Sequence, residues 1–377
     1  MKKKEPIRIA QIMGKWHGGG VESFVMNNYR NINRDIIQFD FICDEDSTAI
    51  PYEEIKKMGG KIILIPPYQK IIKYHKKLKK VLKEGNYIIV HSHINTLSVF
   101  SLCAAKFSGV PVRIAHSHAT SSKKEIFRNI MKMILKSSSS LFANYYFACS
   151  ALAGKYQFGT KKSKNGEVLV LNNAIDINKF LYSNDKSVII KKELQIKNNT
   201  VVVGMVGRLE KVKNHSFGID VFYEFQQKNP NSIMLIIGTG SLEKKLKDKV
   251  EKLKLSNKIL FLNYRNDMDY IYSVFDFFLF PSLYEGFGLS LLEAQCGGAY
   301  CISSTNVIKD VAISNNILFL DIDKGSKYWA TQMEIGKINK NVIFKNDINK
   351  YDINIQSKVL QNIYIKLYES NTCKENK

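Results

Sequence analysis

A strongly apolar run, SVFDFFLF at residues 273–280, predicts a strand that is buried on both faces of a parallel sheet. The run ends at Pro281, and Gly286 and Gly288 follow in what we expect to be a turn. A helix should come next, because apolar residues recur on one helical face: Leu289, Leu292 and Cys296. A buried parallel strand needs strand neighbours and covering helices, so the sequence predicts an α/β sheet with helices on both faces.

The start of this predicted helix is suited to bind a phosphate group. Backbone N–H groups in the first helical turn have no partner inside the helix, and the helix dipole attracts an anion. Glu285 lies in the turn and Glu293 in the helix, and a carboxylate gains nothing by facing a diphosphate. Each glutamate is therefore expected to accept hydrogen bonds from sugar hydroxyl groups, which predicts a nucleotide-sugar ligand. A glycosidase would need two carboxylates about 5 to 10 Å apart across one bond, so we interpret this pair as recognition groups.

The full string EGFGLSLLEA, residues 285–294, resembles the signature of the retaining glycosyltransferases of family 4, also called glycosyl transferases group 1. That family builds capsule, exopolysaccharide and lipopolysaccharide sugars in bacteria. The resemblance covers nearly the whole chain and implies the GT-B fold: two Rossmann-like doubly wound domains facing across a cleft, with a C-terminal helix crossing back to the first domain. It also implies retention of the anomeric configuration, without a protein nucleophile or general base that can be named.

Strands and helices alternate along most of the chain, as this α/β class requires. The N-terminal, acceptor-side domain is expected at residues 1–180, joined by the C-terminal helix at 355–372. The nucleotide-sugar-binding domain is expected at residues 181–354, after a hinge near 172–190. Residues 324–350 form a polar run, to which no helix or strand is assigned.

Two features of the first domain are candidates for ligand contacts. Three consecutive glycines, which include Gly19 and Gly20, follow the first strand and precede Glu22. They lack the G-x-G-x-x-G spacing of an NAD site, and either a tight turn or a mobile turn that admits phosphate or acceptor fits them. The resemblance favours the functional turn, because GGGVE matches the family's glycine-rich loop, and it implies donor contacts from Gly19 and Gly20. Histidines follow two later strands, at the edge where ligands bind such sheets: His91, His93, His116 and His118. The resemblance implies that His116 contacts the donor, while the H-x-H spacing leaves a metal site as the alternative.

Basic residues follow the first strand of the second domain. Arg208 comes directly after Gly207, and Lys213 lies five residues further on. Arginine offers a planar fork to two phosphate oxygens and lysine a point charge, so the pair can hold a diphosphate and stabilise it as it leaves. The resemblance implies this role and adds donor contacts from the turn at Gly238 and Gly240 and from the backbone around Tyr264 and Arg265. Asn263 replaces the family's usual glycine, so the sequence departs from the pattern where the base would bind.

The expected catalytic residues are His116, Arg208, Lys213 and Glu285. The donor site is completed by Glu293, which would hold the ribose, and by the backbone of Gly286, Phe287, Gly288 and Leu289. No cofactor and no metal are expected, because the two basic residues and a helix N-terminus already supply positive potential to the leaving group. Three D-x-D strings, at residues 44–46, 267–269 and 321–323, keep a metal-dependent alternative open.

The chain carries a net charge of +22, and most of the excess lies in its first half. Residues 1–180 contain 29 Lys and Arg against 13 Asp and Glu. Basic residues crowd two predicted helices, one at 70–83 and one at 123–136 with a stripe of Lys124, Arg128, Lys132 and Lys136. We therefore expect the first domain to dock on an anionic membrane surface, the alternative being a solvated surface that reflects genome composition. A nucleic-acid partner is not expected, since charge alone would support it.

The six cysteines show no C-x-x-C pair, which argues against a disulfide framework and against a zinc site. The sequence has no apolar stretch typical of a signal peptide or a membrane span. These features predict a cytoplasmic protein, peripheral on the inner face of the plasma membrane. The expected reaction moves a hexose-type sugar from a UDP-sugar to a saccharide or an undecaprenyl-diphosphate-linked acceptor. A nucleotide-sugar epimerase or a phosphorylase of the same architecture is the alternative.

Overall fold

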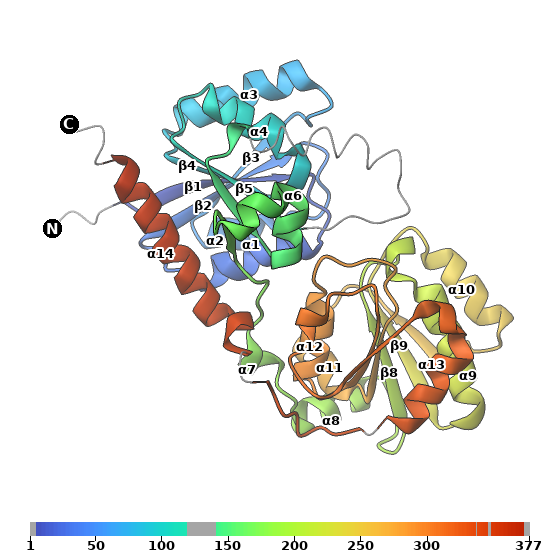
Figure 1. Cartoon of the computed structure of the whole chain (residues 1–377). Helices are drawn as coiled ribbons and strands as arrows, with labels where there is room; N and C mark the ends of the chain where they lie inside the picture. The colour runs from blue at the N-terminus through green and yellow to red at the C-terminus, as the bar shows by residue number, and fades with distance from the viewer. Residues whose placement is uncertain (1–4, 119–140, 337, 346–347, 373–377) are drawn as a thin grey trace. The chain divides into compact units, whose positions relative to one another are not determined.

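The computed structural model describes residues 5–118, 141–336, 338–345 and 348–372. The chain divides into two compact units (Figure 1). Unit 1 comprises Met1–Ala174 and Lys350–Lys377, and unit 2 comprises Ile175–Asn349. The sequence placed these boundaries a few residues later, at 180 and 354. The difference arises at the short helix α7 (Ile177–Phe180), which contacts helices α11 and α12 of unit 2.

Unit 1 is built on a parallel sheet, whose strands in the described residues run in the order β3-β2-β1-β4-β5-β6-β7. The strands are β1 (Ile7–Gly14), β2 (Ile37–Asp44), β3 (Lys61–Ile65), β4 (Ile89–Ser92), β5 (Val112–Ser117), β6 (Tyr145–Ala148) and β7 (Val168–Val170). The connecting helices are α1 (Gly20–Asn31), α2 (Tyr52–Lys57), α3 (Ile71–Glu84), α4 (Ser98–Lys106) and α6 (Ala151–Lys164), with a 3-10 turn η1 (Asn95–Leu97). Chain order reverses between β1 and β4, which is where ligands bind in doubly wound sheets.

Unit 2 repeats this plan, with strands in the order β10-β9-β8-β11-β12-β13. The strands are β8 (Val201–Val206), β9 (Ser232–Ile237), β10 (Ile259–Leu262), β11 (Phe277–Phe280), β12 (Tyr300–Ser304) and β13 (Ile317–Leu320). Besides α7, the helices are α8 (Asn184–Glu193), α9 (His215–Lys228), α10 (Glu243–Lys252), α11 (Met268–Val274), α12 (Leu289–Cys296) and α13 (Gly325–Ile335). Shorter 3-10 turns are η2 (Lys211–Lys213), η3 (Lys309–Val311) and η4 (Ile322–Lys324), while η5 (Ile348–Tyr351) spans the boundary between unit 2 and the C-terminal part of unit 1. In the sheet of unit 2, the chain order of the strands reverses between β8 and β11.

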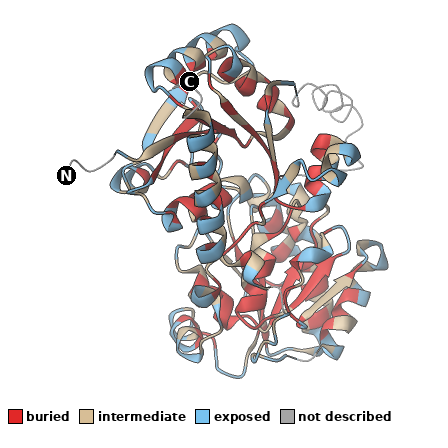
Figure 2. Ribbon diagram, turned by 60° about the vertical axis from the view of Figure 1, so that its left-hand side comes forward, coloured by how far each residue is buried: buried red, intermediate tan, exposed pale blue. Residues whose placement is uncertain are grey.

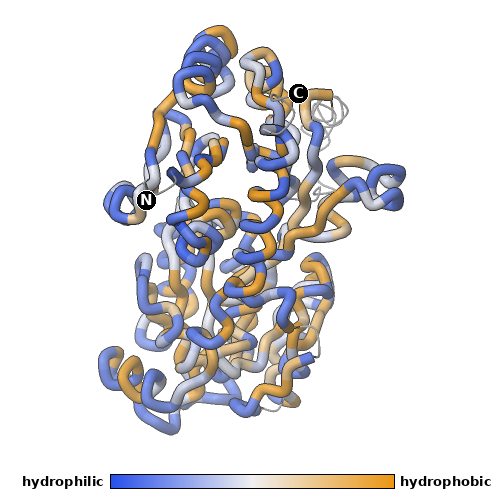
Figure 3. The backbone as a smooth tube through the Cα atoms, turned by 90° about the vertical axis from the view of Figure 1, so that its left-hand side faces the viewer, coloured by the Kyte–Doolittle hydropathy of each residue, from blue (hydrophilic) through white to orange (hydrophobic). Residues whose placement is uncertain are grey.

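Burial follows the layers that this topology creates. Figure 2 shows the central strands largely buried and much of the helix surface exposed, whereas the edge strands β3 and β7 are mostly not buried. Hydrophobic and hydrophilic segments alternate along the backbone trace in both units (Figure 3). All four residues of β11 are buried, which confirms that the apolar run before Pro281 forms a central strand. The predicted α/β class with two Rossmann-like sheets is therefore confirmed.

The C-terminal helix α14 (Ile353–Thr372) packs on unit 1, although it follows unit 2 in the chain. Leu360 and Tyr364 belong to the apolar core of unit 1, and the Tyr364 ring lies 5.9 Å from the ring of Phe39. The Gln361 side chain accepts a hydrogen bond from the backbone N–H of Asn33 at 2.9 Å. These contacts confirm that the C-terminal helix returns to the first domain.

One helix was missed by the sequence analysis, which treated residues 324–350 as a polar run. The structure forms α13 there, with Trp329, Ala330 and Met333 buried in the core of unit 2. The Trp329 ring packs edge-on at 5.3 Å from Phe217 of α9. Three apolar residues at helical spacing are enough to bury this helix, even though the surrounding residues are polar. In the described residues, no helix has the length and apolarity needed to cross a membrane.

Candidate active site

The turns that follow β8 and β9 in unit 2 are joined by backbone hydrogen bonds. The N–H of Leu209 donates to the carbonyl of Thr239 at 2.9 Å. The Glu210 carboxylate accepts from both the backbone N–H and the hydroxyl of Ser241, at 3.1 and 2.9 Å. The predicted donor contacts at Gly207 and at Gly238 and Gly240 therefore lie in neighbouring, connected turns.

Glycine is required where these two turns approach most closely. A Cβ atom on Gly238 would lie 2.2 Å from the carbonyl oxygen of Gly207, and Gly238 has a φ of +135°. A Cβ atom on Gly240 would lie 2.6 Å from the Leu209 carbonyl oxygen. Both positions therefore exclude side chains, because a side chain at either one would force the two turns apart.

Lys213 and Glu285, which the sequence analysis placed in one site, form an ion pair. The Lys213 ammonium lies 2.5 Å from a Glu285 carboxylate oxygen, and both side chains are largely buried. The ammonium also lies 5.1 Å from the ring centroid of Phe280, at the end of β11. The lysine stem passes Gly207, whose Cβ position would be 3.4 Å from it. Lys213 is thus held in place on three sides before any ligand binds.

The glycine turn after β11 ends at the N-terminus of α12. Gly288 is the N-cap residue, with φ of +94° and ψ of +62°, and no side chain caps the helix. Leu289 begins the helix, while Gly286 is half-buried and Phe287 is buried. The left-handed Gly288 lets the chain turn from Glu285 into the helix, so the carboxylate lies beside an uncapped helix N-terminus.

Arg208 and the residues expected near the nucleobase, Tyr264 and Arg265, differ from Lys213 in the contacts that hold their side chains. The Arg208 side chain is exposed. The Arg265 guanidinium donates to the carboxylates of Glu193 and Asp267, two pairs that raise its pKa, and Tyr264 is 79% exposed. The Arg265 side chain is therefore engaged in ion pairs within the described residues. Its backbone and the segment around Tyr264 remain the candidates for contact with the nucleobase of the donor.

Glu293 lies in α12 and is half-buried. Burial raises the pKa of its carboxyl to about 7, while the neighbouring Tyr272 hydroxyl and the charge of Lys179 oppose this shift. Near neutral pH the group can therefore exist with or without its proton. The deprotonated form accepts hydrogen bonds on both oxygens, which suits two hydroxyl groups of a ribose better than the protonated form, whose O–H is itself a donor.

We expect the stability of the chain to fall as pH rises from about 4.5 to about 7, through the action of Glu293. In this window the folded chain keeps a proton that the unfolded chain, with the ordinary glutamate value of 4.5, has lost. Nucleotide binding should show the opposite trend, because a ligand that needs the carboxylate binds more tightly as pH rises through about 7. Urea titrations and nucleotide titrations across this range measure both slopes. Glu293→Gln should flatten them, whereas Glu251→Gln on the exposed side of unit 2 should not. Unchanged slopes in Glu293→Gln would contradict the assignment.

The glycine turn of unit 1 is closed by its own glutamate. Glu22 accepts from the N–H of His17 and from the N–H of Gly19, both at 3.0 Å, and so caps α1. Apart from its chain neighbours and the backbone of its own helix, nothing lies within 4 Å of the position that a Gly20 Cβ would take. Within unit 1, Glu22 therefore has a structural role, and the space beside Gly20 is open.

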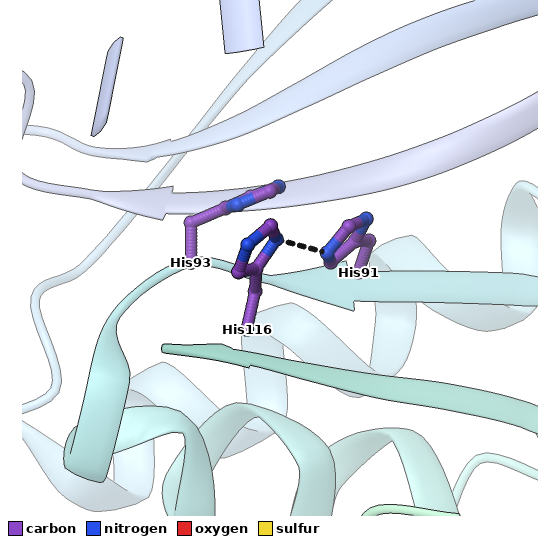
Figure 4. Close-up of side chains that lie close together, drawn as sticks. All are labelled: His91, His93 and His116. Atoms are coloured by element: carbon purple, nitrogen blue, oxygen red, sulfur yellow. Dashed lines mark hydrogen bonds between the residues drawn. The ribbon is translucent and has the colours of Figure 1, made fainter. Parts of the chain in front are cut away.

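The four histidines predicted at the strand ends do meet. His91 and His116 are linked by a ring-nitrogen hydrogen bond of 3.0 Å (Figure 4). His93 and His118 are linked by one of 2.9 Å. Burial lowers the pKa of all four well below the usual 6.5, to about 3 for His118. They are therefore neutral at physiological pH. Nitrogen atoms of His91, His93 and His116 lie within 4.8 Å of one another, so the metal alternative also falls on this cluster.

A cavity in unit 1 was not predicted. It has a volume of about 170 Å³ and lies where β1 to β4 end. Its lining includes the carboxylates Asp44 and Asp46, the ammonium of Lys15, and the rings of Tyr68 and Tyr74. Burial and the nearby Asp46 raise the pKa of Asp44 to about 6. The available signal was the position of Asp44 at the end of a strand, which the sequence analysis considered only as part of a D-x-D string.

The comparisons with known proteins agree over both units. Residues 18–179 match the model of Glycosyltransferase Family 4, and residues 187–321 match that of Glycosyl transferases group 1. The chain is 28% identical over 313 residues to the Escherichia coli UDP-Gal:alpha-D-GlcNAc-diphosphoundecaprenol alpha-1,3-galactosyltransferase, which covers 79% of each chain. It is 26% identical over 372 residues to the capsular polysaccharide biosynthesis glycosyltransferase CapH of Staphylococcus aureus, covering 95% of this chain and 99% of CapH. The crystal structure of Anabaena HepE in complex with UDP-glucose shares the fold, with a TM-score of 0.73, 16% identity, and coverage of 97% and 99%.

Proposed function

The chain belongs to the group 1, family 4 glycosyltransferases, and we propose that it moves a hexose-type sugar from a UDP-sugar with retention of configuration. The proposed acceptor is a saccharide or a saccharide linked to undecaprenyl diphosphate, in the synthesis of a bacterial surface polysaccharide. The E. coli relative, whose name gives a UDP-galactose donor and a diphosphoundecaprenol acceptor, supports both choices. The HepE structure, which contains UDP-glucose, supports the donor.

The ion pair between Lys213 and Glu285 is the observation that carries this proposal. It places a cation and a hydroxyl-accepting carboxylate side by side, next to the N-terminus of α12. In a nucleotide-sugar the diphosphate and the sugar are joined by one bond, so adjacent groups of opposite charge suit the two sides of that bond. Lys213 would donate to the departing diphosphate while it stays beside Glu285, and the other acceptor sites of the Glu285 carboxylate would accept from sugar hydroxyl groups.

The donor is tested by measuring nucleotide release from UDP-, GDP- and TDP-sugars, with and without lipid-linked saccharide acceptors. We expect release from a UDP-sugar that requires the acceptor and yields a product with the anomeric configuration of the donor. An epimerase would change the sugar without acceptor and without nucleotide release, and a phosphorylase would need inorganic phosphate instead of a nucleotide-sugar. Inverted product or acceptor-independent turnover would overturn the proposal.

The cavity of unit 1 is the site that we propose for the acceptor sugar. Carboxylates accept from hydroxyl groups, and aromatic rings pack on the apolar face of a sugar ring; the lining offers both, through Asp44 and Asp46 and through Tyr68 and Tyr74. Lys15 forms an ion pair of 2.7 Å with Asp46 and could also meet the phosphate of a lipid-linked acceptor. The cavity and the proposed donor site lie in different units, as a two-substrate enzyme allows.

Transfer should not depend on a divalent metal. Lys213, Arg208 and the start of α12 can supply the positive potential that a metal would otherwise bring to the leaving diphosphate. The D-x-D carboxylates make other contacts: Asp269 with Lys186 at 2.8 Å, Asp46 with Lys15, and Asp321 with the N–H of Asp323. We expect the full rate to persist in EDTA. A loss that Mn²⁺ or Mg²⁺ restores would favour the metal-dependent alternative.

Unit 1 is proposed to dock on an anionic membrane face through helix α3. Tyr74, Leu78 and Leu82 are buried, while the opposite face exposes Lys73, Lys76, Lys77, Lys80 and Lys83. Ile72, at the start of the helix, is 81% exposed beside these charges. The second basic stripe, at residues 123–136, lies outside the described residues. Each lysine near an anionic surface contributes about 1 kcal/mol, screened over about 8 Å at physiological salt.

Co-sedimentation with vesicles of increasing anionic-lipid content measures this docking. Binding should rise with lipid charge, fall with salt, and decrease in the triple variant Lys73→Glu, Lys76→Glu, Lys77→Glu. The triple variant Lys244→Glu, Lys245→Glu, Lys252→Glu on α10 of unit 2 changes the net charge equally and should bind as the wild type does. Equal recovery on neutral and anionic vesicles would contradict docking without affecting the transferase assignment.

A further inference from the structure

The four histidines of unit 1 belong to one continuous chain of hydrogen bonds. The two histidine pairs are joined by Gln11 of β1 and Tyr364 of α14. The Gln11 amide nitrogen donates to the Tyr364 hydroxyl at 3.1 Å, and the Gln11 oxygen lies 2.7 Å from His93 Nε2. The Tyr364 hydroxyl lies 2.6 Å from His91 Nδ1. The order is therefore His118, His93, Gln11, Tyr364, His91, His116.

The direction of every bond in this chain follows from the Gln11 amide. Because its oxygen can only accept, His93 must carry its proton on Nε2, and its Nδ1 must accept from His118 Nε2. Because Tyr364 accepts from the amide nitrogen, its own proton must point to His91 Nδ1. His91 then carries its proton on Nε2 and donates to His116 Nδ1. All four histidines thus share one tautomer, with the proton on Nε2.

The two ends of the chain have opposite hydrogen-bonding character. His116 Nε2 and His118 Nδ1 are buried and have no partner in the part of the chain that the structure describes. By the order above, the first is an N–H donor and the second is a lone-pair acceptor. Turning the Gln11 amide over would reverse every bond, yet one end would still donate and the other accept. The two rings are stacked, with centroids 4.0 Å apart, so the donor and the acceptor belong to adjacent rings.

A donor and an acceptor on adjacent neutral rings fit a hydroxyl group, which can accept from one and donate to the other. They do not fit a phosphate, which would find no positive charge here and would face the lone pair of His118. Buried polar atoms without partners are costly, so a ligand that satisfies both is favoured. Phe24 of α1 covers the pair, with its ring 5.0 Å from His116 and 5.1 Å from His118. Phe24 belongs to the helix that begins at the glycine turn of unit 1.

We propose that Tyr364 and Gln11 are positioning residues, which fix the proton of each histidine so that His116 and His118 together bind one hydroxyl group of a substrate sugar. The identity of the ligand rests on the proposed transferase function, whereas the tautomer assignment does not. Tyr364 is the member that the C-terminal helix contributes to unit 1. Helix α14 therefore contributes a member of the hydrogen-bond chain at the edge of the unit 1 sheet, in addition to stabilising this unit.

The assignment is tested on the full chain with nitrogen-15-labelled histidine and no substrate, because imidazole nitrogen shifts distinguish the two neutral tautomers. In the wild type, His91, His93, His116 and His118 should all show the same single tautomer. Tyr364→Phe removes the hydroxyl that fixes the tautomer of His91, so His91 and His116 should each change to a mixture of the two neutral tautomers. Tyr29→Phe is the matched control, since it deletes another buried hydroxyl of unit 1, bonded to Gln38 at 2.6 Å, and should leave the histidine signals unchanged.

Three results would overturn the proposal. Mixed or differing tautomers among the four histidines of the wild type would contradict the directed chain, whether or not any variant folds. A Tyr364→Phe spectrum identical to the wild type would show that Tyr364 positions nothing. Added Zn²⁺ that shifts His91, His93 and His116 stoichiometrically would show a metal site in place of a fixed hydrogen-bond chain. The expected result with UDP-sugar is a selective shift of His116 and His118. Spectra that respond to no sugar substrate, with the tautomers as assigned, would overturn only the hydroxyl ligand.

Discussion

Replacing Lys213 with alanine is expected to lower the rate of sugar transfer by roughly two to three orders of magnitude, while the chain still folds. Removing one preorganised donor to a developing anion costs about 3 kcal/mol in enzymes that stabilise such a charge. Lys213 is preorganised in this sense, because Glu285, Phe280 and the Gly207 backbone hold it before the ligand arrives. Arg208→Ala is expected to slow transfer in the same direction. Steady-state rates with saturating UDP-sugar measure both effects.

The matched control is Lys211→Ala, which removes an exposed lysine from the same 3-10 turn. It should transfer sugar at the wild-type rate, and its unfolding temperature should match that of Lys213→Ala. If Lys213→Ala and Arg208→Ala also transferred at the wild-type rate, the diphosphate would not be held by these residues. If Lys213→Ala lost activity together with its fold, Lys213→Gln, which keeps most of the buried stem, would separate the two causes.

The elements around this site could be predicted because each has a local sequence signal. The run before Pro281 is apolar at every buried position of β11, and glycines mark the turn where a side chain would not fit. The contact between Lys213 and Glu285 joins residues 72 positions apart, and no periodicity in either segment brings them together. The sequence analysis assigned both residues to one ligand but did not predict that they would form an ion pair.

The histidine cluster shows where sequence reasoning stops. Parallel strands end at one edge of a sheet, so the adjacent strand ends of β4 and β5 were enough to predict that His91 and His116 would meet. Tyr364 could not be predicted to join them, because it lies 273 residues from His91 and reads only as an apolar position of an amphipathic helix. The proton positions depend on Tyr364 and Gln11, and these become visible only when α14 is placed on unit 1.

Helix α13 and the cavity of unit 1 were missed for a different reason. Trp329 and Met333 stand in a run of polar and basic residues, so their burial depends on the groove beside α9 and not on local composition. The cavity is formed by the ends of four strands and the start of α3, and its residues are scattered between Gly14 and Leu97. Neither the volume nor the lining of such a space is encoded in any one segment.

Gly238→Ala is expected to destabilise unit 2 and to weaken nucleotide binding, through one steric cause. The new Cβ atom would lie 2.2 Å from the Gly207 carbonyl oxygen, and an alanine at a φ of +135° is strained. Backbone strain and overpacking each cost about 1 to 3 kcal/mol. Together they should lower the unfolding temperature of a unit of this size by on the order of 10 °C. Calorimetry of the full chain measures the shift.

Thr239→Ala is the control for this change, because it shortens an exposed side chain between the same two glycines without adding an atom to the backbone contact. Its effect on stability should stay within about 0.5 kcal/mol. The clash in Gly238→Ala can be relieved only by separating the turn after β9 from the turn after β8, which carries Gly207 and Arg208. Nucleotide affinity, measured well below the unfolding temperature, should therefore fall in Gly238→Ala and not in Thr239→Ala. A Gly238→Ala chain with wild-type stability and affinity would mean that these two turns are not in the close contact on which the donor site depends.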